Sequence, residues 1–298
     1  MNSRGKRELL AALLLAALLL AAALFSRSAQ IGEAQAGEAQ AGEEPPSAVS
    51  LDYCADQYLI ALGEPRQVLA VSPNATSEYS FLFEQAGNFP KLRASAEEIL
   101  VLQPDLAIRQ FGGEPEILPL LDRLGIEVVQ LGYSDSPESA RSNLRLVAKA
   151  LGREARAEEL IADMNSRLEA VRARAAGKGR SALYLTPGGF TSGADTFIDA
   201  VIKAAGLENA GAAGGRAGWY DLNLESIVLN PPDLIIGSFF DLKTSRMNHW
   251  SVARHSLVKE MLETRPSVIV PGRYVACSAW FFVEAVEMID RALSGGEG

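Results

Sequence analysis

The chain has few of the residues from which catalytic and metal sites are usually built. Its 298 residues include only two histidines, His249 and His255, and two cysteines, Cys54 and Cys277. A resident zinc or manganese site normally needs three or four converging His, Cys or carboxylate ligands. No G-x-S-x-G, H-E-x-x-H or P-loop motif occurs either. We therefore expect no metal centre and no cofactor, and an enzyme is the least favoured class.

Basic residues are also in deficit. The chain carries 28 Lys and Arg against 37 Asp and Glu, and residues 30–298 alone hold 24 basic and 36 acidic side chains, a formal charge of −12. Proteins that bind nucleic acids usually present a basic face, so we expect no nucleic-acid partner. With 48% hydrophobic and 22% charged residues, the chain has the composition of a globular protein. Its length suffices for about two domains.

The only long apolar run stands at the N-terminus. Three basic residues precede 17 consecutive Leu, Ala and Phe residues, Leu9 to Phe25. This pattern predicts a secretory signal over residues 1–29. Because the run reaches the lower limit for crossing a bilayer, an uncleaved N-terminal anchor is the alternative. Residues 30–47 repeat the phrase GEAQA and include Pro45 and Pro46, which predicts a flexible linker.

Export also bears on the two cysteines. In an oxidising compartment Cys54 and Cys277 could form one disulfide or remain two buried thiols. Geometry decides between these alternatives, and the spacing of the cysteines does not.

Short β-branched runs alternate with helical stretches on both sides of the middle of the chain. Such alternation predicts parallel sheets covered on both faces, and hence two α/β lobes of Rossmann-like type. The predicted strands are 48–51, 68–71, 106–108 and 128–131, then 182–186, 234–237 and 268–270. The predicted helices are 53–62, 94–102 and 114–124, then 196–205, 224–229 and 280–293.

Between the two series lies one long helical segment. Ser136 and Pro137 are typical of an N-cap and a first helical residue, and apolar positions then recur with helical spacing almost to Gly177, with a break expected at Gly152. The segment is either a core helix of one domain or a rigid connection between lobes, and the interruption of the strand pattern favours the connection. The predicted domains are therefore 48–136, a connecting helix over 137–177, and 178–298.

One phrase occurs in both predicted lobes. Glu97, Ile99, Pro104, Asp105, Leu106 and Ile108 recur 128 residues later as Glu225, Ile227, Pro232, Asp233, Leu234 and Ile236. A helix, a Pro-Asp turn and an apolar strand are common in α/β proteins, which explains part of the match. A matched exposed Glu is not explained in this way.

The segments AEEILVLQPDLAI (96–108), LESIVLNPPDLII (224–236) and SLDYCADQYLIAL (50–62), with the central helix, resemble the periplasmic substrate-binding proteins of iron-siderophore, haem and vitamin B12 importers. The resemblance covers nearly all of residues 48–293. It implies two lobes joined by one long helix, with a ligand in the cleft between them. It also implies that Glu97 and Glu225 pair with arginines of a membrane permease, with Glu98 as an alternative to Glu97.

Candidate cleft residues lie in loops after predicted strands, where open α/β sheets place their ligands. They are Tyr53, Tyr79, Arg109, Phe111, Phe190, Trp219, Tyr220 and Arg273. Trp250, in the segment Asn248-His249-Trp250, is a further candidate, and the alternative for this segment is a loop at the start of a helix. By resemblance to the vitamin B12-binding member, Phe190 and Trp219 press on the ligand. Each aromatic residue could instead be an ordinary half-buried loop residue, and each Arg could be solvated or paired with a carboxylate.

With the export signal, the resemblance implies an exported, monomeric solute-binding component of an ABC importer. It would capture a cobalamin, another corrinoid or a ferric siderophore in the periplasm and deliver it to the permease and its ATPase. A haem carrier of the same family and a membrane-anchored envelope sensor with the same fold are the alternatives. Aromatic faces suit flat conjugated ligands, but the residues do not distinguish among these chelates.

Overall fold

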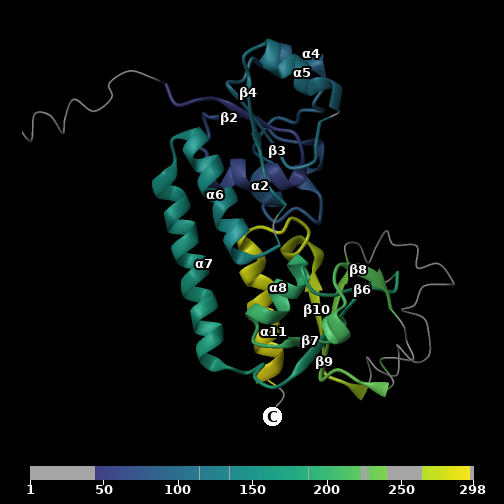
Figure 1. The fold of residues 1–298 in the computed structure, drawn as a ribbon. Helices are drawn as coiled ribbons and strands as arrows, with labels where there is room; N and C mark the ends of the chain where they lie inside the picture. Colours follow the sequence, from purple (N-terminus) through teal and green to yellow (C-terminus); the bar gives the residue numbers. More distant parts are fainter. Residues whose placement is uncertain are drawn as a thin grey trace, which may run out of the picture. The chain divides into compact units, whose positions relative to one another are not determined.

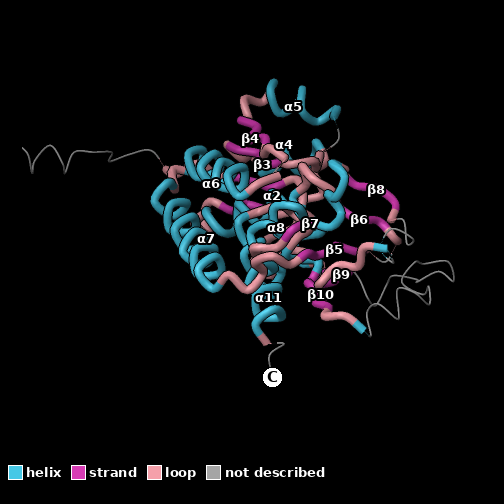
Figure 2. Tube along the Cα trace, turned by 60° about the horizontal axis from the view of Figure 1, so that its bottom comes forward, coloured by secondary structure: helices cyan, strands magenta, loops and turns pink. Residues whose placement is uncertain are grey.

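The computed structural model describes residues 44–113, 115–133, 135–186, 188–222, 227, 229–239 and 264–295. The chain divides into two compact units, 1–44 and 45–298, and the fold described below belongs to the second. Its two parallel sheets, each covered by helices, confirm the predicted α/β class (Figures 1 and 2). In the described part of the chain no helix combines the length and the apolar character needed to span a bilayer.

The first sheet, here the N-sheet, has the strand order β2-β1-β3-β4 with all strands parallel. Its strands are β1 (Ala48–Ser50), β2 (Val68–Ala70), β3 (Leu106–Arg109) and β4 (Glu127–Gln130). The helices of this N-lobe are α2 (Tyr53–Leu62), α3 (Phe83–Ala86), α4 (Ala96–Leu102) and α5 (Leu118–Arg123). The helix predicted over 114–124 is shorter because a 3-10 turn, Pro115–Ile117, precedes α5.

The second sheet, the C-sheet, has the order β10-β9-β5-β7, again parallel. Its strands are β5 (Ser181–Leu185), β7 (Glu208–Asn209), β9 (Leu234–Phe239) and β10 (Ser267–Pro271), and its helices are α8 (Phe197–Ala204) and α11 (Val283–Ser294). An antiparallel pair that sequence analysis did not predict, β6 (Phe190–Ser192) with β8 (Trp219–Asp221), flanks this sheet. The sheet and its helices form the C-lobe.

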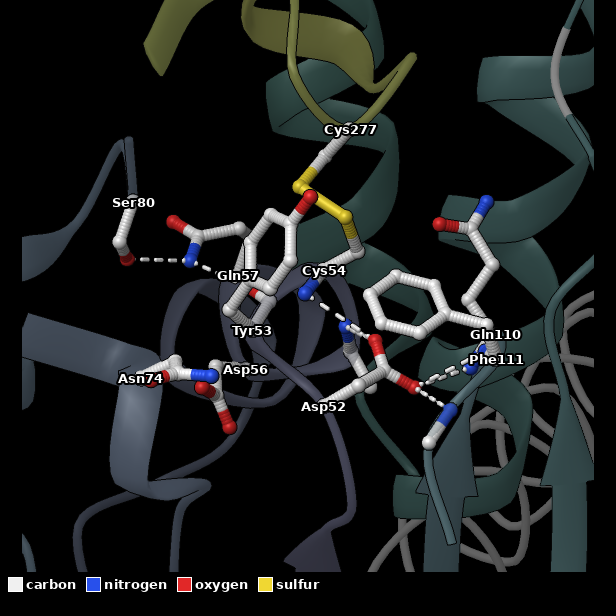
Figure 3. The surroundings of a disulfide bond; sticks show 12 residues. Asp52, Tyr53, Cys54, Asp56, Gln57, Asn74, Ser80, Gln110, Phe111 and Cys277 are labelled. Carbon is white, nitrogen blue, oxygen red and sulfur yellow. Dashed lines mark hydrogen bonds between the residues drawn. A yellow bond between two sulfur atoms is a disulfide. The ribbon is translucent and has the colours of Figure 1, made fainter. Parts of the chain in front are cut away.

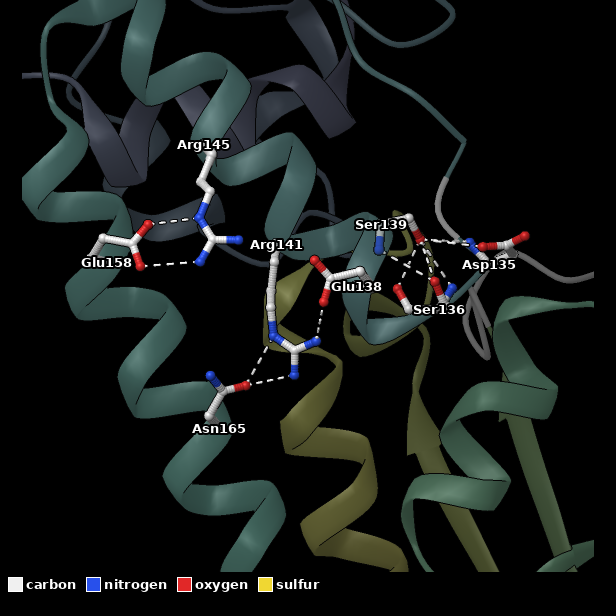
Figure 4. A network of polar contacts seen from close by, with 8 residues as sticks. All are labelled: Asp135, Ser136, Glu138, Ser139, Arg141, Arg145, Glu158 and Asn165. Carbon is white, nitrogen blue, oxygen red and sulfur yellow. Dashed lines mark hydrogen bonds and ion pairs between the residues drawn. The ribbon is translucent and has the colours of Figure 1, made fainter.

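Two helices connect the lobes. They are α6 (Pro137–Leu151) and α7 (Glu154–Arg174), and Gly152 ends α6 in the left-handed conformation with φ of 67°. Ser136 caps α6 in a capping box with Ser139. Figure 4 shows how polar side chains join the two helices: Arg141 donates to Asn165 at 2.6 and 3.0 Å, and Arg145 pairs with Glu158 at 2.7 Å.

The Asp of the repeated Pro-Asp turn makes equivalent hydrogen bonds in both lobes. Asp105 accepts hydrogen bonds from the backbone N–H and the hydroxyl of Ser47, both at 2.7 Å. Asp233 accepts the same two bonds from Ser181, at 2.7 and 3.0 Å. Each carboxylate therefore ties the start of its own strand, β3 or β9, to the start of the neighbouring strand, β1 or β5. These hydrogen bonds lower the pKa of both carboxyl groups.

Apolar side chains form one continuous core and two outer clusters. The continuous core takes residues from α2, α6, α7, α8 and α11 and from the inner faces of both sheets. The first outer cluster covers the other face of the N-sheet and includes Ile99 of α4. The second covers the corresponding face of the C-sheet and includes Ile227. Each sheet is thus a middle layer between two apolar layers.

A buried carboxyl group fixes α2 against β1 and β2. Asp56 has no exposed surface and accepts hydrogen bonds from the Ser50 hydroxyl and from the Ser72 backbone N–H and hydroxyl, the last two at 2.8 and 2.6 Å. Burial raises the pKa of Asp56 from 3.8 to about 6, although these hydrogen bonds favour the charged form. Between pH 4 and 6 the carboxyl therefore keeps its proton in the folded chain and loses it in the unfolded chain.

This difference predicts that the free energy of unfolding falls as the pH rises through that window. The contribution of Asp56 is about 3 kcal/mol, at about 1.4 kcal/mol per pKa unit. Asp56→Asn cannot ionise, and its amide can donate to the Ser72 hydroxyl while its oxygen accepts the other two bonds. Measured by urea unfolding, the stability of the variant relative to the parent should rise by about 3 kcal/mol from pH 4 to pH 7. Parallel pH profiles would show that Asp56 titrates normally.

Candidate functional site

The order of strands in the N-sheet reverses between β1 and β3, because the connections that leave these two strands run to opposite edges of the sheet. From β1 the chain adds β2 on one side and β3 on the other. In open parallel sheets such a switch point leaves a crevice at the carboxyl ends of the two strands, where ligands bind. The segments that follow here are Leu51–Tyr53 after β1 and Gln110–Gly113 after β3.

Asp52 joins these two segments (Figure 3). One carboxylate oxygen accepts from the backbone N–H groups of Cys54 and Ala55 and so caps α2, at 3.1 and 2.9 Å. The other accepts from the backbone N–H groups of three successive residues, Gln110, Phe111 and Gly112, at 2.7 to 3.1 Å. A side chain at Gly112 would not fit, because its Cβ would lie 2.2 Å from the carbonyl oxygen of Leu51. The two segments therefore hold each other in one conformation.

Three predicted site residues gather beside these segments. The ring of Tyr53 makes edge contacts with Tyr79, at 4.8 Å between centroids, and with Phe111, at 5.3 Å. We call these three residues the aromatic cluster. Phe111 is 55% exposed, whereas Tyr53 and Tyr79 are half-buried. Burial raises the pKa of the Tyr53 hydroxyl, and the nearby Tyr79 and Asp52 raise it further.

Gln57 holds the loop that carries Tyr79. Its amide nitrogen donates to the backbone oxygen of Tyr53 and to the Ser80 hydroxyl, both at 2.7 Å, and its amide oxygen accepts from the backbone N–H of Leu82 at 2.7 Å. Gln57 is fully buried. The position of Tyr79 beside Tyr53 is therefore set by hydrogen bonds from α2.

The structure joins Cys54 and Cys277 in a disulfide, with 5.2 Å between their Cα atoms (Figure 3). Cys54 lies in the first turn of α2, soon after β1, and Cys277 follows β10. The bond therefore holds the carboxyl ends of the two sheets toward each other, directly beside Tyr53. Of the alternatives left open by the sequence, the structure has the disulfide.

Aromatic contacts reinforce this junction between the lobes. Phe81 stacks on Phe281 with 4.2 Å between ring centroids. The guanidinium of Arg273, which follows β10, lies 5.9 Å from the ring centroid of Phe83 in α3 and 5.2 Å from that of Tyr274. Arg273 thus lies between the lobes and has aromatic partners on both sides of the junction.

On the C-lobe, the β6–β8 pair separates its aromatic residues onto two faces. Ser192 pairs with Trp219, Thr191 with Tyr220 and Phe190 with Asp221. Because side chains alternate along a strand, Phe190 and Trp219 share one face and Tyr220 lies on the other. Phe190 is 46% exposed and Trp219 49%, and Trp219 packs edge-on against the buried Tyr184 at 5.7 Å.

Tyr220 belongs to different surroundings. Its hydroxyl donates to the backbone oxygen of Gly211, and Arg216 lies over its ring at 5.3 Å. It borders a hollow of about 900 Å³ that extends to Ser181 and Pro232. Since these residues stand at the amino ends of β5 and β9, this hollow lies away from the carboxyl ends of the strands. The structure therefore does not bring Tyr220 together with Trp219.

The remaining predicted residues are placed as follows. Arg109 ends β3 on the face of Ala107, and its Nε atom is buried with no hydrogen-bond partner among the described residues. Glu97 is exposed in the first turn of α4.

Trp250 and Glu225 lie outside the described residues, as do both histidines. Within the described segments, no three His, Cys, Asp or Glu side chains are grouped so that they could hold a metal ion.

Asp52 and Gln57 were not among the predicted site residues, although both position them. Asp52 had a usable signal, because an Asp directly before a helical run is typical of an N-cap. Its bonds to the segment after β3 depend on strand order, which a single sequence does not reveal. Gln57 had no signal, since a polar residue within a helix is usually exposed.

This geometry predicts that Asp52→Ala is more damaging than the loss of an ordinary helix cap. The variant leaves three additional, partly buried backbone N–H groups without their acceptor, so the free energy of unfolding should fall by about 3 kcal/mol. Ser95→Ala, which removes the cap of α4 with its single bond to Glu98, is the control and should cost about 1 kcal/mol. Equal losses in urea unfolding would mean that Asp52 acts as a helix cap alone.

Comparison with known proteins is consistent with this architecture. The chain is 25% identical over 203 residues to an uncharacterized ABC transporter substrate-binding lipoprotein, YvrC, of Bacillus subtilis, covering 65% of this chain and 63% of that protein. It is 28% identical over 199 residues to a cobalamin-binding protein of Halobacterium salinarum, covering 65% and 54%. The chain thus aligns with less than two thirds of the length of either relative.

Among solved structures, the periplasmic haem-binding protein RhuT from Roseiflexus sp. RS-1 has the same fold. The TM-score is 0.67 at 24% sequence identity, over 85% of this chain and 99% of RhuT. In addition, the profile of the family described as "Periplasmic binding protein" matches residues 49–261 of this chain. The two parallel sheets, the connecting helices and this match together establish that the chain belongs to the periplasmic binding protein family.

Proposed function

We propose that this protein is the solute-binding component of an ABC importer and that it captures a metal chelate, either a corrinoid such as cobalamin or a ferric siderophore. The observation that carries the proposal is the aromatic cluster at the switch point of the N-sheet. Phe190 and Trp219 supply a second exposed aromatic surface on the C-lobe. Aromatic faces bind conjugated ligands by removing flat apolar area from water.

A preassembled chelate fits these residues better than a free metal ion. The cluster offers rings and two phenol groups, Tyr53 and Tyr79, and the metal of a chelate arrives with its own ligands. The buried Nε of Arg109 is a further donor close to the carboxyl end of β3. The Halobacterium relative, named as a cobalamin-binding protein, supports the corrinoid as the first ligand to test.

Haem is the second candidate, and one observation favours it. Tyr53 and Tyr79 lie in contact with each other, and a tyrosine oxygen can serve as an axial ligand of ferric haem. The structural neighbour RhuT is described as haem-binding. An absorption spectrum distinguishes the candidates, because Tyr53→Phe should alter the spectrum of a haem complex and leave that of a cobalamin complex unchanged.

We further propose that the protein is exported and that it has no catalytic activity. Residues 1–29 would act as the export signal and 30–47 as the linker to the folded part, so that the protein works as a monomer in the periplasm. An uncleaved signal would instead make it an anchored protein, and sequencing the N-terminus of the mature protein separates the two. Members of this family bind solutes for transport, which supports a carrier without catalytic activity.

The direct test is calorimetric titration of the purified protein with cyanocobalamin, ferric hydroxamate and catecholate siderophores, and haemin. We expect one of these ligand classes to bind with a dissociation constant of about 1 μM or lower, which corresponds to a binding free energy of about −8 kcal/mol or a more negative value. If none binds, and mass spectrometry of protein purified from its host finds a sugar, peptide or amino acid in place of a chelate, the proposed ligand class is wrong.

Trp219→Ala should weaken binding of the chelate by about 1 to 3 kcal/mol, the scale of losing a buried aromatic contact. The fold should survive, because Trp219 is half exposed at the edge of the C-lobe. Tyr220→Phe is the matched control, since it alters the neighbouring residue on the opposite face of β8. Unchanged affinity in Trp219→Ala would remove the β6–β8 pair from the site.

The proposal assigns permease docking to Glu97 and Glu225. In the N-lobe, Glu98 is half-buried and accepts from the backbone N–H of Arg93 at 2.6 Å, whereas Glu97 is exposed. Glu97 is therefore the residue available to a cationic partner. Glu225 stands at the equivalent position of the repeat, outside the described residues.

Reversal of both charges should abolish ligand-stimulated transport and leave the affinity for the chelate intact. Charge pairs at a partly desolvated interface contribute about 1 to 3 kcal/mol each. The variant is Glu97→Arg with Glu225→Arg, and the charge-matched control is Glu127→Arg with Glu169→Arg, two exposed positions on β4 and α7. Transport assayed in proteoliposomes at the parent rate would show that the two Glu residues are ordinary surface carboxylates.

A further inference from the structure

The two lobes expose an apolar side chain at the same place. Val101 is 82% exposed and Leu229 is 78% exposed, more than any other large apolar side chain that the structure describes. They lie 128 residues apart, which is the offset of the internal repeat. A single exposed aliphatic residue on a protein surface needs no explanation. Two that occupy equivalent positions of a repeat are less easily attributed to chance.

The fold displays both residues in the same way. Ile99 and Ile227 are buried, and each packs in the outer cluster of its own sheet. These equivalent anchors fix the two segments on the faces of the sheets that look away from the continuous core. Val101 and Leu229 follow two residues later and remain outside. Both lobes therefore turn an apolar side chain outward from the same layer.

Each exposed residue borders a hollow. Val101 stands beside a groove of about 380 Å³ whose apolar walls are Ala70, Pro90, Leu92 and Leu102. Leu229 stands at the rim of the hollow of about 900 Å³ near Tyr220, together with Leu222, Ile227 and Pro232. The surface on each lobe thus combines a protruding apolar side chain with a recess that a partner side chain can enter.

The charge beside the apolar residue indicates the chemistry of the partner. Glu97 precedes Val101 by four residues in α4, so the two side chains share one face of the helix. Glu97 also lines the groove. In the repeat, Glu225 precedes Leu229 by the same four residues. A partner that fits the N-lobe surface offers a cation next to an apolar pocket, and the same sequence spacing in the C-lobe indicates a partner with two such sites.

We propose that Val101 and Leu229 are apolar anchors of the docking surface, and that their partner is a membrane permease built of two like subunits. Each anchor enters an apolar pocket on one subunit, and the pocket for Val101 lies next to the arginine or lysine that binds Glu97. This inference rests on the proposed function and extends it, because the carboxylates orient the complex and the apolar contacts hold it together. Anchors of this kind commonly dominate the affinity of an interface.

The test compares Val101→Ser with Leu229→Ser, singly and together, for binding to the purified permease–ATPase complex of the same organism in lipid nanodiscs. Each single variant should weaken the complex about tenfold, and the double variant about a hundredfold. Leu146→Ser, at another exposed apolar position on α6, is the control and should bind like the parent. The effect should persist in 0.5 M salt, whereas that of Glu97→Gln should be smaller there.

The outcomes separate this inference from the proposed function. If the parent binds both chelate and permease, and the double serine variant binds the permease equally well, the anchors are refuted and the function stands. If the parent does not bind the permease, both are refuted. If the parent self-associates in sedimentation experiments and the double variant does not, the apolar residues join copies of this chain, and the permease is the wrong partner.

Discussion

The short turn after β1 is the constraint on which the rest of the molecule depends. Within three residues it contains Asp52, whose carboxylate accepts five backbone N–H groups, Tyr53, which is the centre of the aromatic cluster, and Cys54, which is bonded to the other lobe. The conformation of the candidate site and the approach of the two lobes are therefore set by the same few residues. A change in the conformation of the site would therefore alter the approach of the lobes, and a change in that approach would alter the site.

Comparison of the two copies of the internal repeat distinguishes the residues that build the sheets from those that build the candidate site. The features that recur in both lobes are the Pro-Asp turn, the bond from Asp to the Ser of the neighbouring strand, and the buried Ile of the outer cluster. They build and cover a parallel sheet. Among the residues that the structure describes, the turn after β1 has no such counterpart after β5, where Thr186 leads into the β6–β8 pair. The two walls of the site thus differ, although they stand on similar sheets.

Much of the fold was predictable because local chemistry determined it. The apolar runs predicted the strands of both parallel sheets except the two-residue β7. Ser136 and Pro137 predicted the start of α6, and Gly152 predicted its end. The β6–β8 pair was not predicted, because its strands are three residues long and follow glycine-rich loops. The separation of Tyr220 from Trp219 could not be predicted without recognising β8 as a strand, since alternation places neighbours on opposite faces. The disulfide depended on the approach of two segments 223 residues apart, which no local pattern encodes.

The account makes one central claim, that a junction between the lobes holds the aromatic cluster in the position in which it receives a chelate. The most direct measurement is a crystal structure of the protein with the chelate that it binds most tightly. We predict that the chelate contacts Tyr53 and Trp219, and that the lobes keep the separation fixed by Cys54 and Cys277. A chelate bound in the hollow beside Tyr220, or lobes rotated widely about the connecting helices, would contradict the account.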